Sequence, residues 1–288
     1  MELNGDGHLD ILSGSYSRHE AEMAGLFQVL HGSKDGWKKP VALNGSDGQP
    51  LILPMGSGEG DIIDRICTRP FAVDLDGDGK LDIVSGNFRG TFAWFRGEGG
   101  GKFAPVATWL EVDGDKLSVG MHGDPFFVDY DKDGDFDLFS GSAEGGVFWF
   151  QNVGSKTAPK WKKGVTLLEA AGHGAHGADA IQFGDAHCKV PSADTRVWVD
   201  DVDGDGKLDL LVGDQVRLMH AAKGVDEKDA RSKYAAWSKQ QQEFFKKPQP
   251  EDEAGQKAWQ TEYEALDKAK EAFLIEEATG FVWLLRGK

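Results

Sequence analysis

The sequence predicts an all-β chain, a β-propeller of about four four-stranded blades, with one inserted α-helical hairpin. Four related acidic segments begin at Glu2, Asp74, Asp129 and Asp201, at intervals of 72, 55 and 72 residues. Repetition at this scale is typical of propeller blades or solenoids. Short apolar runs flank the segments, and the 39 glycines favour many turns. One long segment, 226–277, is nearly free of glycine and has a different character.

Each acidic segment joins two short apolar runs. The run after it is "LDILSG", "LDIVSG", "FDLFSG" or "LDLLVG", and the run before it, missing in the first copy, is "PFAVD", "PFFVD" or "RVWVD". A third run carries aromatic residues, as in "GTFAWFRGE", and a weaker fourth closes most units, as in "KFAPVATWLEV". Four short strands with turns between them predict one antiparallel blade per unit. Radial repetition of such blades hides most sheet edges.

The two ends of this array are incomplete. The first unit lacks its inner strand and the last lacks its outer strand. Either the chain is a fragment of a larger propeller, with further blades or domains outside it, or the four blades close imperfectly. We also expect that Met1 is not the natural start and that export information lies upstream, because the first residues already belong to a repeat.

Residues 226–277 have the pattern of two helices separated by "PQP". Apolar side chains recur at spacings of three, four or seven, which predicts an antiparallel helical hairpin. The predicted domains are therefore the blades over 1–225, the hairpin over 226–277 and the returning strand of the last blade over 278–288. The hairpin is a lid, a docking arm, a spacer or an inert elaboration. Its mixed charges argue against a membrane-binding helix.

The net charge of −16 is concentrated in the acidic segments, because the acidic residues outside them nearly balance the 32 basic ones. An acidic chain repels nucleic acid and anionic membranes. No apolar run is long enough for insertion into a membrane. Two cysteines, Cys67 and Cys188, are too few for a disulfide framework, although a single bridge between them stays open.

The spacing of oxygen ligands in the acidic segments predicts up to four Ca²⁺ sites. Side chains at positions 1, 3, 5 and 9 and the carbonyl at position 7 can converge, as at the start of an EF-hand loop. The ion would cross-link the two inner strands by neutralising carboxylates that otherwise repel. Mg²⁺ fits less well, and the alternative is a solvated acidic turn. The predicted ligands are Glu2, Asn4, Asp6, His8, Asp10, Asp74, Asp76, Asp78, Lys80, Asp82, Asp129, Asp131, Asp133, Asp135, Asp137, Asp201, Asp203, Asp205, Lys207 and Asp209.

These segments also carry a family resemblance. The motif D-x-D-G-D-G-x-x-D followed by an apolar strand and glycine is complete at 74–86 and 201–213. It resembles the FG-GAP/VCBS repeat family, which includes the integrin α-subunit propeller and many secreted bacterial proteins. The third copy has Lys132 where glycine is usual, and the first departs further, with Glu2 and Asn4 replacing aspartates. The resemblance implies a propeller and a calcium ion, and it implies no substrate.

Alternation of the strands places all the acidic loops on one face of the predicted disc. The other connections form the opposite face, which receives most of the histidines and several arginines, so we predict that it binds the ligand. His173 and His176 have an H-x-x-H spacing that suits a transition metal, or they are solvated in a glycine-rich loop. The predicted ligand-binding residues are Arg65, Arg69, His122, His173, His176 and His187.

The function predicted from these features is a non-catalytic binding or adhesion module for carbohydrate or protein. Loops of this type need the calcium levels found outside cells, which predicts a secreted or cell-surface protein. The alternative is a polysaccharide-active lyase or hydrolase on a propeller scaffold, because fold alone does not decide function. Neither a nucleophile elbow nor a phosphate loop is evident, which favours the binding module.

Overall fold

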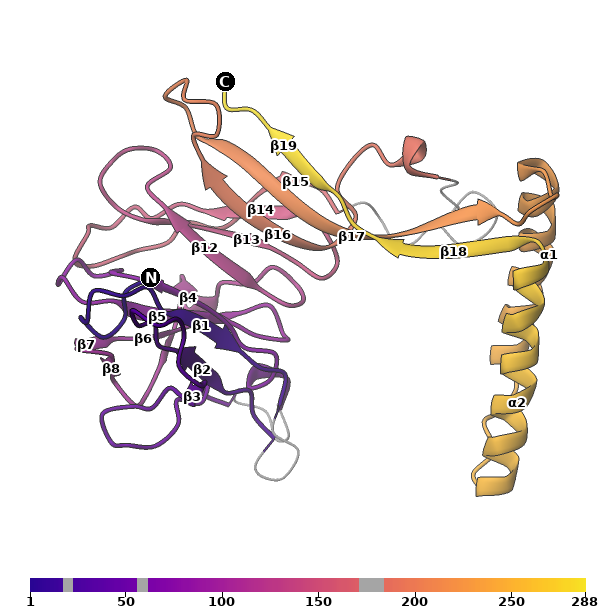
Figure 1. The fold of residues 1–288 in the computed structure, drawn as a ribbon, viewed down its shortest axis with the longest axis horizontal. Coiled ribbons are helices and arrows are strands. Elements are labelled where there is room, and N and C mark those ends of the chain that lie inside the picture. Colours follow the sequence, from indigo (N-terminus) through magenta and orange to yellow (C-terminus); the bar gives the residue numbers. More distant parts are fainter. Residues whose placement is uncertain (18–22, 56–61, 171–183) are drawn as a thin grey trace. The chain divides into compact units, whose positions relative to one another are not determined.

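The computed structural model describes residues 1–17, 23–55, 62–170 and 184–288. Its contacts divide the chain into two compact units. The sheet unit comprises Met1–Ala171, Ser192–Asp214 and Val282–Lys288, and the helical unit comprises Gly172–Pro191 and Gln215–Phe281. Figure 1 shows the strands of the first unit and the two helices of the second.

Four antiparallel sheets follow one another along the sheet unit, one for each acidic loop. The first has the order β1-β2-β3, the second β4-β5-β6-β9 and the third β12-β13-β14-β15; in the fourth, β17 pairs with both β16 and β19. The strands of the first two sheets are β1 (Ile11–Gly14), β2 (Phe27–Leu30), β3 (Val41–Ala42), β4 (Arg69–Val73), β5 (Asp82–Gly86), β6 (Phe92–Phe95) and β9 (Thr108–Trp109). Those of the last two are β12 (Asp124–Val128), β13 (Asp137–Gly141), β14 (Val147–Phe150), β15 (Val165–Leu168), β16 (Ala193–Asp200), β17 (Asp209–Ala221) and β19 (Val282–Leu285).

The repeated strand pattern is therefore confirmed as a set of antiparallel sheets. In the second, third and fourth sheets the strand that enters the acidic loop pairs with the strand that leaves it, and that strand pairs in turn with the strand formed by the aromatic run. The first sheet has three strands, and its first strand, β1, follows the acidic loop directly. Two small hairpins are added, β7 (Gly97–Gly99) with β8 (Lys102–Phe103) and β10 (Glu111–Val112) with β11 (Asp115–Lys116).

Successive sheets pack face to face, so their central strands are buried on both sides. All residues of β5, β6 and β13 are buried. Phe27, Ile83 and Phe95 share one apolar cluster between the first and second sheets. Another apolar cluster lies between the second and third sheets, and one more lies between the third and fourth sheets. No closed ring of sheets is found among the described residues, so the propeller stays a prediction.

The helical unit contains α1 (Glu227–Phe245) and α2 (Glu253–Ala269), two antiparallel helices as the sequence predicts. The side chains of Asp226 and Asp252 cap them by accepting backbone hydrogen bonds at 2.9 and 2.8 Å. Trp237 lies between the helices, where its Nε1 donates to the carbonyl of Leu266 at 2.9 Å. Neither helix is both long and apolar enough to cross a membrane.

A two-stranded ladder in the helical unit was not expected from the sequence. Strand β17 continues past Gly213, and its residues Val216–Ala221 pair with β18 (Leu274–Thr279). The first part of β18 falls in the segment expected to be helical. The period-two burial of Val216 and Leu218 explains the extension, because alternate side chains of a strand face one side. Short helices of one turn also occur at Ile62–Asp64, Asp185–His187 and Lys270–Ala272.

Candidate metal centres and the inner-strand cluster

Each acidic loop, numbered from its first acidic residue, bends sharply at positions 4 and 6. In the second loop Gly77 and Gly79 occupy these positions with φ of 66° and 85°. In the third loop Lys132 takes position 4 with φ of 63°, a conformation that is costly for a residue with a side chain. The backbone shape is therefore kept even where the glycine is lost.

Backbone amides point into each loop and hold its carboxylates. In the second, third and fourth loops the amide at position 6 donates to the first carboxylate: Gly79 to Asp74 at 3.1 Å, Gly134 to Asp129 at 3.2 Å and Gly206 to Asp201 at 2.9 Å. The amide at position 7 donates to the carboxylate at position 5, as from Lys80 to Asp78 at 2.9 Å. These bonds fix the direction in which the remaining carboxylate oxygens point.

Three loops gather carboxylates closely enough to hold one ion. Within each group, one oxygen per residue lies within 4.8 Å of the others; the groups are Asp74, Asp76 and Asp78; Asp129, Asp131 and Asp133; and Asp201, Asp203 and Asp209. Like charges at such distances repel, and a divalent cation removes the repulsion. Carboxylate oxygens are the donors that Ca²⁺ prefers.

Several buried carboxylate oxygens in these loops have no hydrogen-bond partner. They are Oδ1 of Asp74, Oδ1 of Asp76, Oδ1 of Asp129 and Oδ2 of Asp137. Buried polar atoms are almost always satisfied, and each exception needs an explanation. Because all four belong to acidic loops two and three, the donor set fits a bound cation.

The aspartate at position 9 clamps its loop to the third strand of the sheet. Asp82 accepts hydrogen bonds from the amides of Leu75 at 3.0 Å and Gly97 at 2.6 Å. Asp10 and Asp209 make the corresponding pairs of bonds. Burial raises the pKa of Asp82, against the opposing effect of these bonds. The aspartate at position 9 therefore has a structural role of its own, because it links the loop to the third strand.

Asp137 differs from the other aspartates at position 9. One of its oxygens accepts from the amide of Asn152 at 2.7 Å, and the other is unpartnered although Asp137 is only 1% exposed. Burial raises its pKa to about 6, and the nearby charges of Asp131 and Asp133 act in the same direction. A cation bound in the third loop would offset the repulsion among these carboxylates.

Sequence reasoning missed one residue of each centre, at the end of the third strand. Arg96 donates to Asp76 at 2.8 Å, Gln151 donates to Asp131 at 2.5 Å, and Arg286 pairs with Asp203. The sequence contained a signal for these residues. Each aromatic run ends in one polar residue, and the residue after it donates its amide to the aspartate at position 9.

The first loop satisfies its own polar groups. Glu2 accepts from the amides of Asn4 at 3.2 Å, Gly5 at 2.8 Å and Gly7. The side-chain amide of Asn4 donates to Asp6 at 3.2 Å, where an aspartate would add a charge. These substitutions replace part of the repulsion by internal hydrogen bonds, so this loop has less need of an ion.

At the opposite ends of the inner strands, charged residues from three sheets meet. Arg69, Asp124 and Arg196 lie in β4, β12 and β16. Asp124 is 3.9 Å from Nη1 of Arg69 and 3.2 Å from Nε of Arg196. Nδ1 of His122 lies 3.3 Å from Nη2 of Arg69, and its buried Nε2 has no partner. We call these four residues the inner-strand cluster.

Burial changes the protonation of the inner-strand cluster. It raises the pKa of Asp124 to about 6, and the charge of Arg69 opposes this rise. It lowers the pKa of His122, and here the charge of Arg69 acts in the same direction. At neutral pH the cluster therefore holds a neutral imidazole beside two guanidinium groups and one carboxylate.

The other predicted ligand-binding residues are Arg65, His173, His176 and His187. Nε of Arg65 donates to the carbonyl of Leu53 at 3.0 Å. His173 and His176 lie outside the described residues, and the backbone of His187 belongs to a short helix of the helical unit. Cys67 and Cys188 are not joined by a disulfide.

The buried Asp64 has partners that the sequence did not indicate. Its carboxylate is 2.5 Å from Nε of Arg89 and 3.4 Å from Nζ of Lys116. Because Asp64 is only 1% exposed, these cations compensate a buried charge, so we assign this group a structural role.

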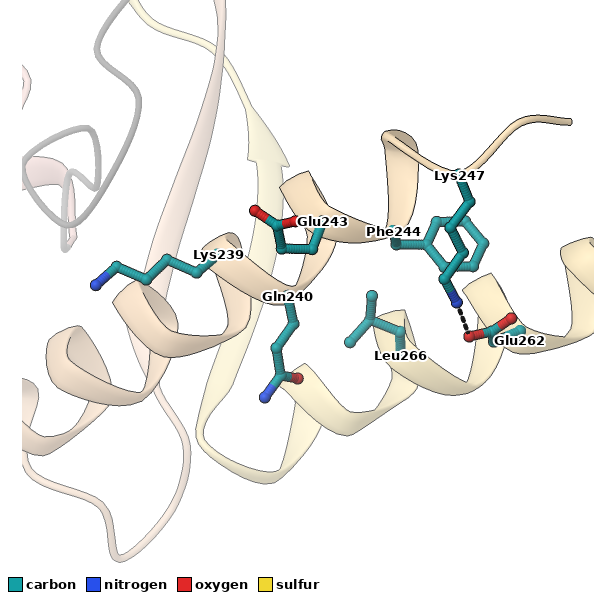
Figure 2. A pocket seen from close by; sticks show the side chains of 7 residues that line it. All are labelled: Lys239, Gln240, Glu243, Phe244, Lys247, Glu262 and Leu266. Carbon is teal, nitrogen blue, oxygen red and sulfur yellow. Dashed lines mark hydrogen bonds and ion pairs between the residues drawn. The ribbon is translucent and has the colours of Figure 1, made fainter.

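The helical unit holds a separate cavity of about 440 Å³ between α1 and α2. Figure 2 shows Phe244 and Leu266 between the helices and Lys247 paired with Glu262. Lys239 and Glu243 add one charge of each sign to the lining. Because the charges balance, the cavity has no electrostatic preference for an anion or a cation.

Comparison with known proteins supports the repeat assignment. A search of curated proteins and a search of solved structures each gave no match. A family model described as an FG-GAP-like repeat matches residues 74–140. These residues begin at the second acidic loop and end in the strand that follows the third. The match at residues 74–140 is consistent with an FG-GAP/VCBS repeat family.

Proposed function

We propose that this chain is a calcium-stabilised, propeller-like binding module that works outside the cytoplasm without catalysing a reaction. The observation that carries the proposal is the set of buried, unpartnered carboxylate oxygens in acidic loops two and three. A bound Ca²⁺ would satisfy these oxygens and join the two inner strands of each sheet. The calcium levels found outside cells suit loops of this type, which supports a secreted or surface location.

Calcium has a structural role in this proposal. Asp74, Asp76 and Asp78 would hold it in the second loop, with the position-7 carbonyl of Lys80 as a further donor. The equivalent carboxylates and carbonyls would act in the third and fourth loops. Because the ion would occupy their oxygens, these aspartates are not proposed as acids or bases.

Calcium binding is tested by titrating Ca²⁺ into chelator-treated protein in a calorimeter. We expect Asp76→Asn and Asp131→Asn each to remove one site, because each change takes one charged donor from a different loop. Asp35→Asn, at an exposed aspartate outside the acidic loops, is the matched control. Saturating Ca²⁺ should raise the Tm by several degrees, because a ligand that binds only the folded state stabilises it. Absence of both the heat signal and the shift in Tm contradicts the proposal.

The face that carries the inner-strand cluster is proposed to bind a carbohydrate or a protein. Arg69 and His122 are polar groups from adjacent sheets that meet at 3.3 Å, and polar groups that converge from several elements are typical of binding sites. Labelled glycans should be retained by the wild-type protein and lost from His122→Gln. Lack of retention of any glycan or protein probe would overturn this part of the proposal.

The inner-strand cluster also supports a second candidate, a polysaccharide lyase or hydrolase. Arg69 contacts both a carboxyl group with a pKa of about 6, that of Asp124, and His122, and carboxyl and imidazole groups are the usual participants in acid and base catalysis. Release of new reducing ends or unsaturated products from an incubated polysaccharide distinguishes this candidate. Release that disappears in Asp124→Asn would establish catalysis, and retention of intact glycan would favour the binding module.

A further inference from the structure

One flank of helix α1 carries a regular stripe of charged, polar and small side chains. Residues three and four apart lie on the same side of a helix, and alternation of these two spacings is typical of a seam between two helices. Lys247 lies just beyond the last residue of α1, where its amide still donates to the carbonyl of Phe244 at 3.0 Å. The members of this α1 stripe, at spacings of four, three, four, three and four, are Asp229, Lys233, Ala236, Gln240, Glu243 and Lys247.

The α1 stripe borders the cavity between the two helices. Gln240, Glu243 and Lys247 belong to the stripe and also line this cavity of about 440 Å³. Phe244 and Leu266 give the cavity an apolar interior between α1 and α2, as Figure 2 shows. Apolar surface along a pair of helices is typically buried against further helices. The cavity is therefore a place where an additional helix gains contact area.

The charged side chains of the α1 stripe are accessible to a partner. Asp229, Lys233, Glu243 and Lys247 are between 48% and 70% exposed. Within the chain, Lys233 pairs with Asp229 at 2.7 Å, and Glu243 pairs with Lys246 at 2.6 Å. Exposed ion pairs of this kind contribute little to stability. These groups can therefore take partners on another molecule without a large loss to the chain itself.

The order of charges along the α1 stripe is complementary to itself in one orientation. When the stripe lies against a second copy that runs in the opposite direction, Asp229 faces Lys247 and Lys233 faces Glu243. The two central members then place a small side chain opposite a long one. In a parallel pair each residue would face its own equivalent, and all four charged positions would repel. The charge pattern therefore selects antiparallel pairing with a second copy of this chain.

We propose that the flank of the hairpin with the α1 stripe is a docking surface for a second copy of this chain, whose α1 lies antiparallel to form a four-helix bundle. The contact is isologous, so each charged pair is formed twice. Lys233 of the second copy would lie beside Phe244, where its aliphatic stem covers the apolar cavity and its ammonium group reaches Glu243. The inference goes beyond the proposed function and depends neither on calcium nor on the inner-strand cluster.

The experiment exchanges charges in the full chain and measures its mass by sedimentation velocity over a range of protein concentrations, with and without Ca²⁺. We expect the wild type to pass from monomer to dimer as the concentration rises. Lys233→Glu and Glu243→Lys should each weaken the dimer by roughly tenfold or more, because each change places like charges opposite one another twice. Both changes in one chain should restore the dimer, and so should an equimolar mixture of the two single variants.

A matched control is Lys257→Glu, which makes the same change of net charge at an exposed lysine of α2 outside the α1 stripe and should dimerise as the wild type does. Circular dichroism should show equal helix content in all variants, because the substituted side chains are exposed.

Three results overturn the proposal. The first is a wild type that stays monomeric at every concentration, which would leave the cavity to another partner. The second is a dimer that the single changes leave intact or that Lys257→Glu weakens equally. The third is a loss of association in the single variants that neither the double change nor the mixture restores.

Discussion

At the scale of single residues, the acidic loops differ in the side chain that meets position 3. Arg96 brings a positive charge to Asp76, whereas Gln151 brings a neutral amide to Asp131. A cation at position 3 competes with a bound metal ion for the same carboxylate. The third loop, which also contains the unpartnered oxygen of Asp137, should therefore bind calcium more tightly than the second.

Removing this competing charge should strengthen the second loop. We expect Arg96→Gln to raise its calcium affinity by roughly fivefold or more, since one unit charge at a partly exposed site is worth about 1 kcal/mol or more. Calorimetric titration resolves the change, and Lys102→Gln at an exposed lysine is the control for net charge. An equal change in both variants would show that only the overall charge matters.

The inner-strand cluster should make stability depend on pH. The pKa of Asp124 is about 6 in the folded chain against an ordinary value of 3.8, so the folded state holds this proton more tightly. Its contribution to the free energy of unfolding is present below about pH 4 and declines as the pH rises to about 6, by at most about 3 kcal/mol. Asp124→Asn should remove this decline. Thermal unfolding of both proteins across this range in chelator is the measurement, and parallel curves would contradict the assignment.

At the scale of elements, Gly86 and Gly213 occupy equivalent ladder positions, and among the described residues only a Cβ at Gly86 would collide with a neighbouring backbone. Gly86→Ala should destabilise the protein by about 3 kcal/mol or more, because the added Cβ collides with backbone that cannot move freely. Gly213→Ala should be neutral or stabilising by about 0.5–1 kcal/mol. Chemical denaturation of both variants tests the contrast. Equal losses of stability would mean that the two glycines share a local backbone requirement.

At the scale of the whole molecule, the two compact units have separate cores. Trp237 and Phe273 belong to the cluster of the helical unit, which contains no residue of the acidic loops. The calcium sites proposed here belong to the sheet unit. The units should therefore respond independently to changes in either one.

Calorimetric unfolding should show this independence. Trp237→Ala removes a buried ring and its hydrogen bond to Leu266, and should lower the stability of the helical unit by about 3–5 kcal/mol. Chelation should lower only the transition of the sheet unit. A single transition that moves as a whole in both experiments would show that the two units unfold together.

The sequence alone determined the local pattern of this protein. Acidic loops, their flanking strands and the helical hairpin follow from spacing and periodicity, because these depend on neighbours along the chain. The bends at positions 4 and 6 follow from glycine chemistry in the same way. The contact between Asp82 and the third strand also had a signal in the sequence, namely the pair of residues that ends each aromatic run.

Only the tertiary structure decided which distant residues meet. It joined Arg69, His122 and Asp124 across two sheets, paired Arg96 with Asp76 and bonded Arg65 to the carbonyl of Leu53. It also extended β17 beyond Gly213 and showed that a Cβ at this glycine meets nothing within 4 Å among the described residues, whereas a Cβ at Gly86 meets the carbonyl of Gly123. The physical reason is that sheet stacking sets these contacts, and stacking depends on side-chain volume and backbone approach between segments far apart in the chain.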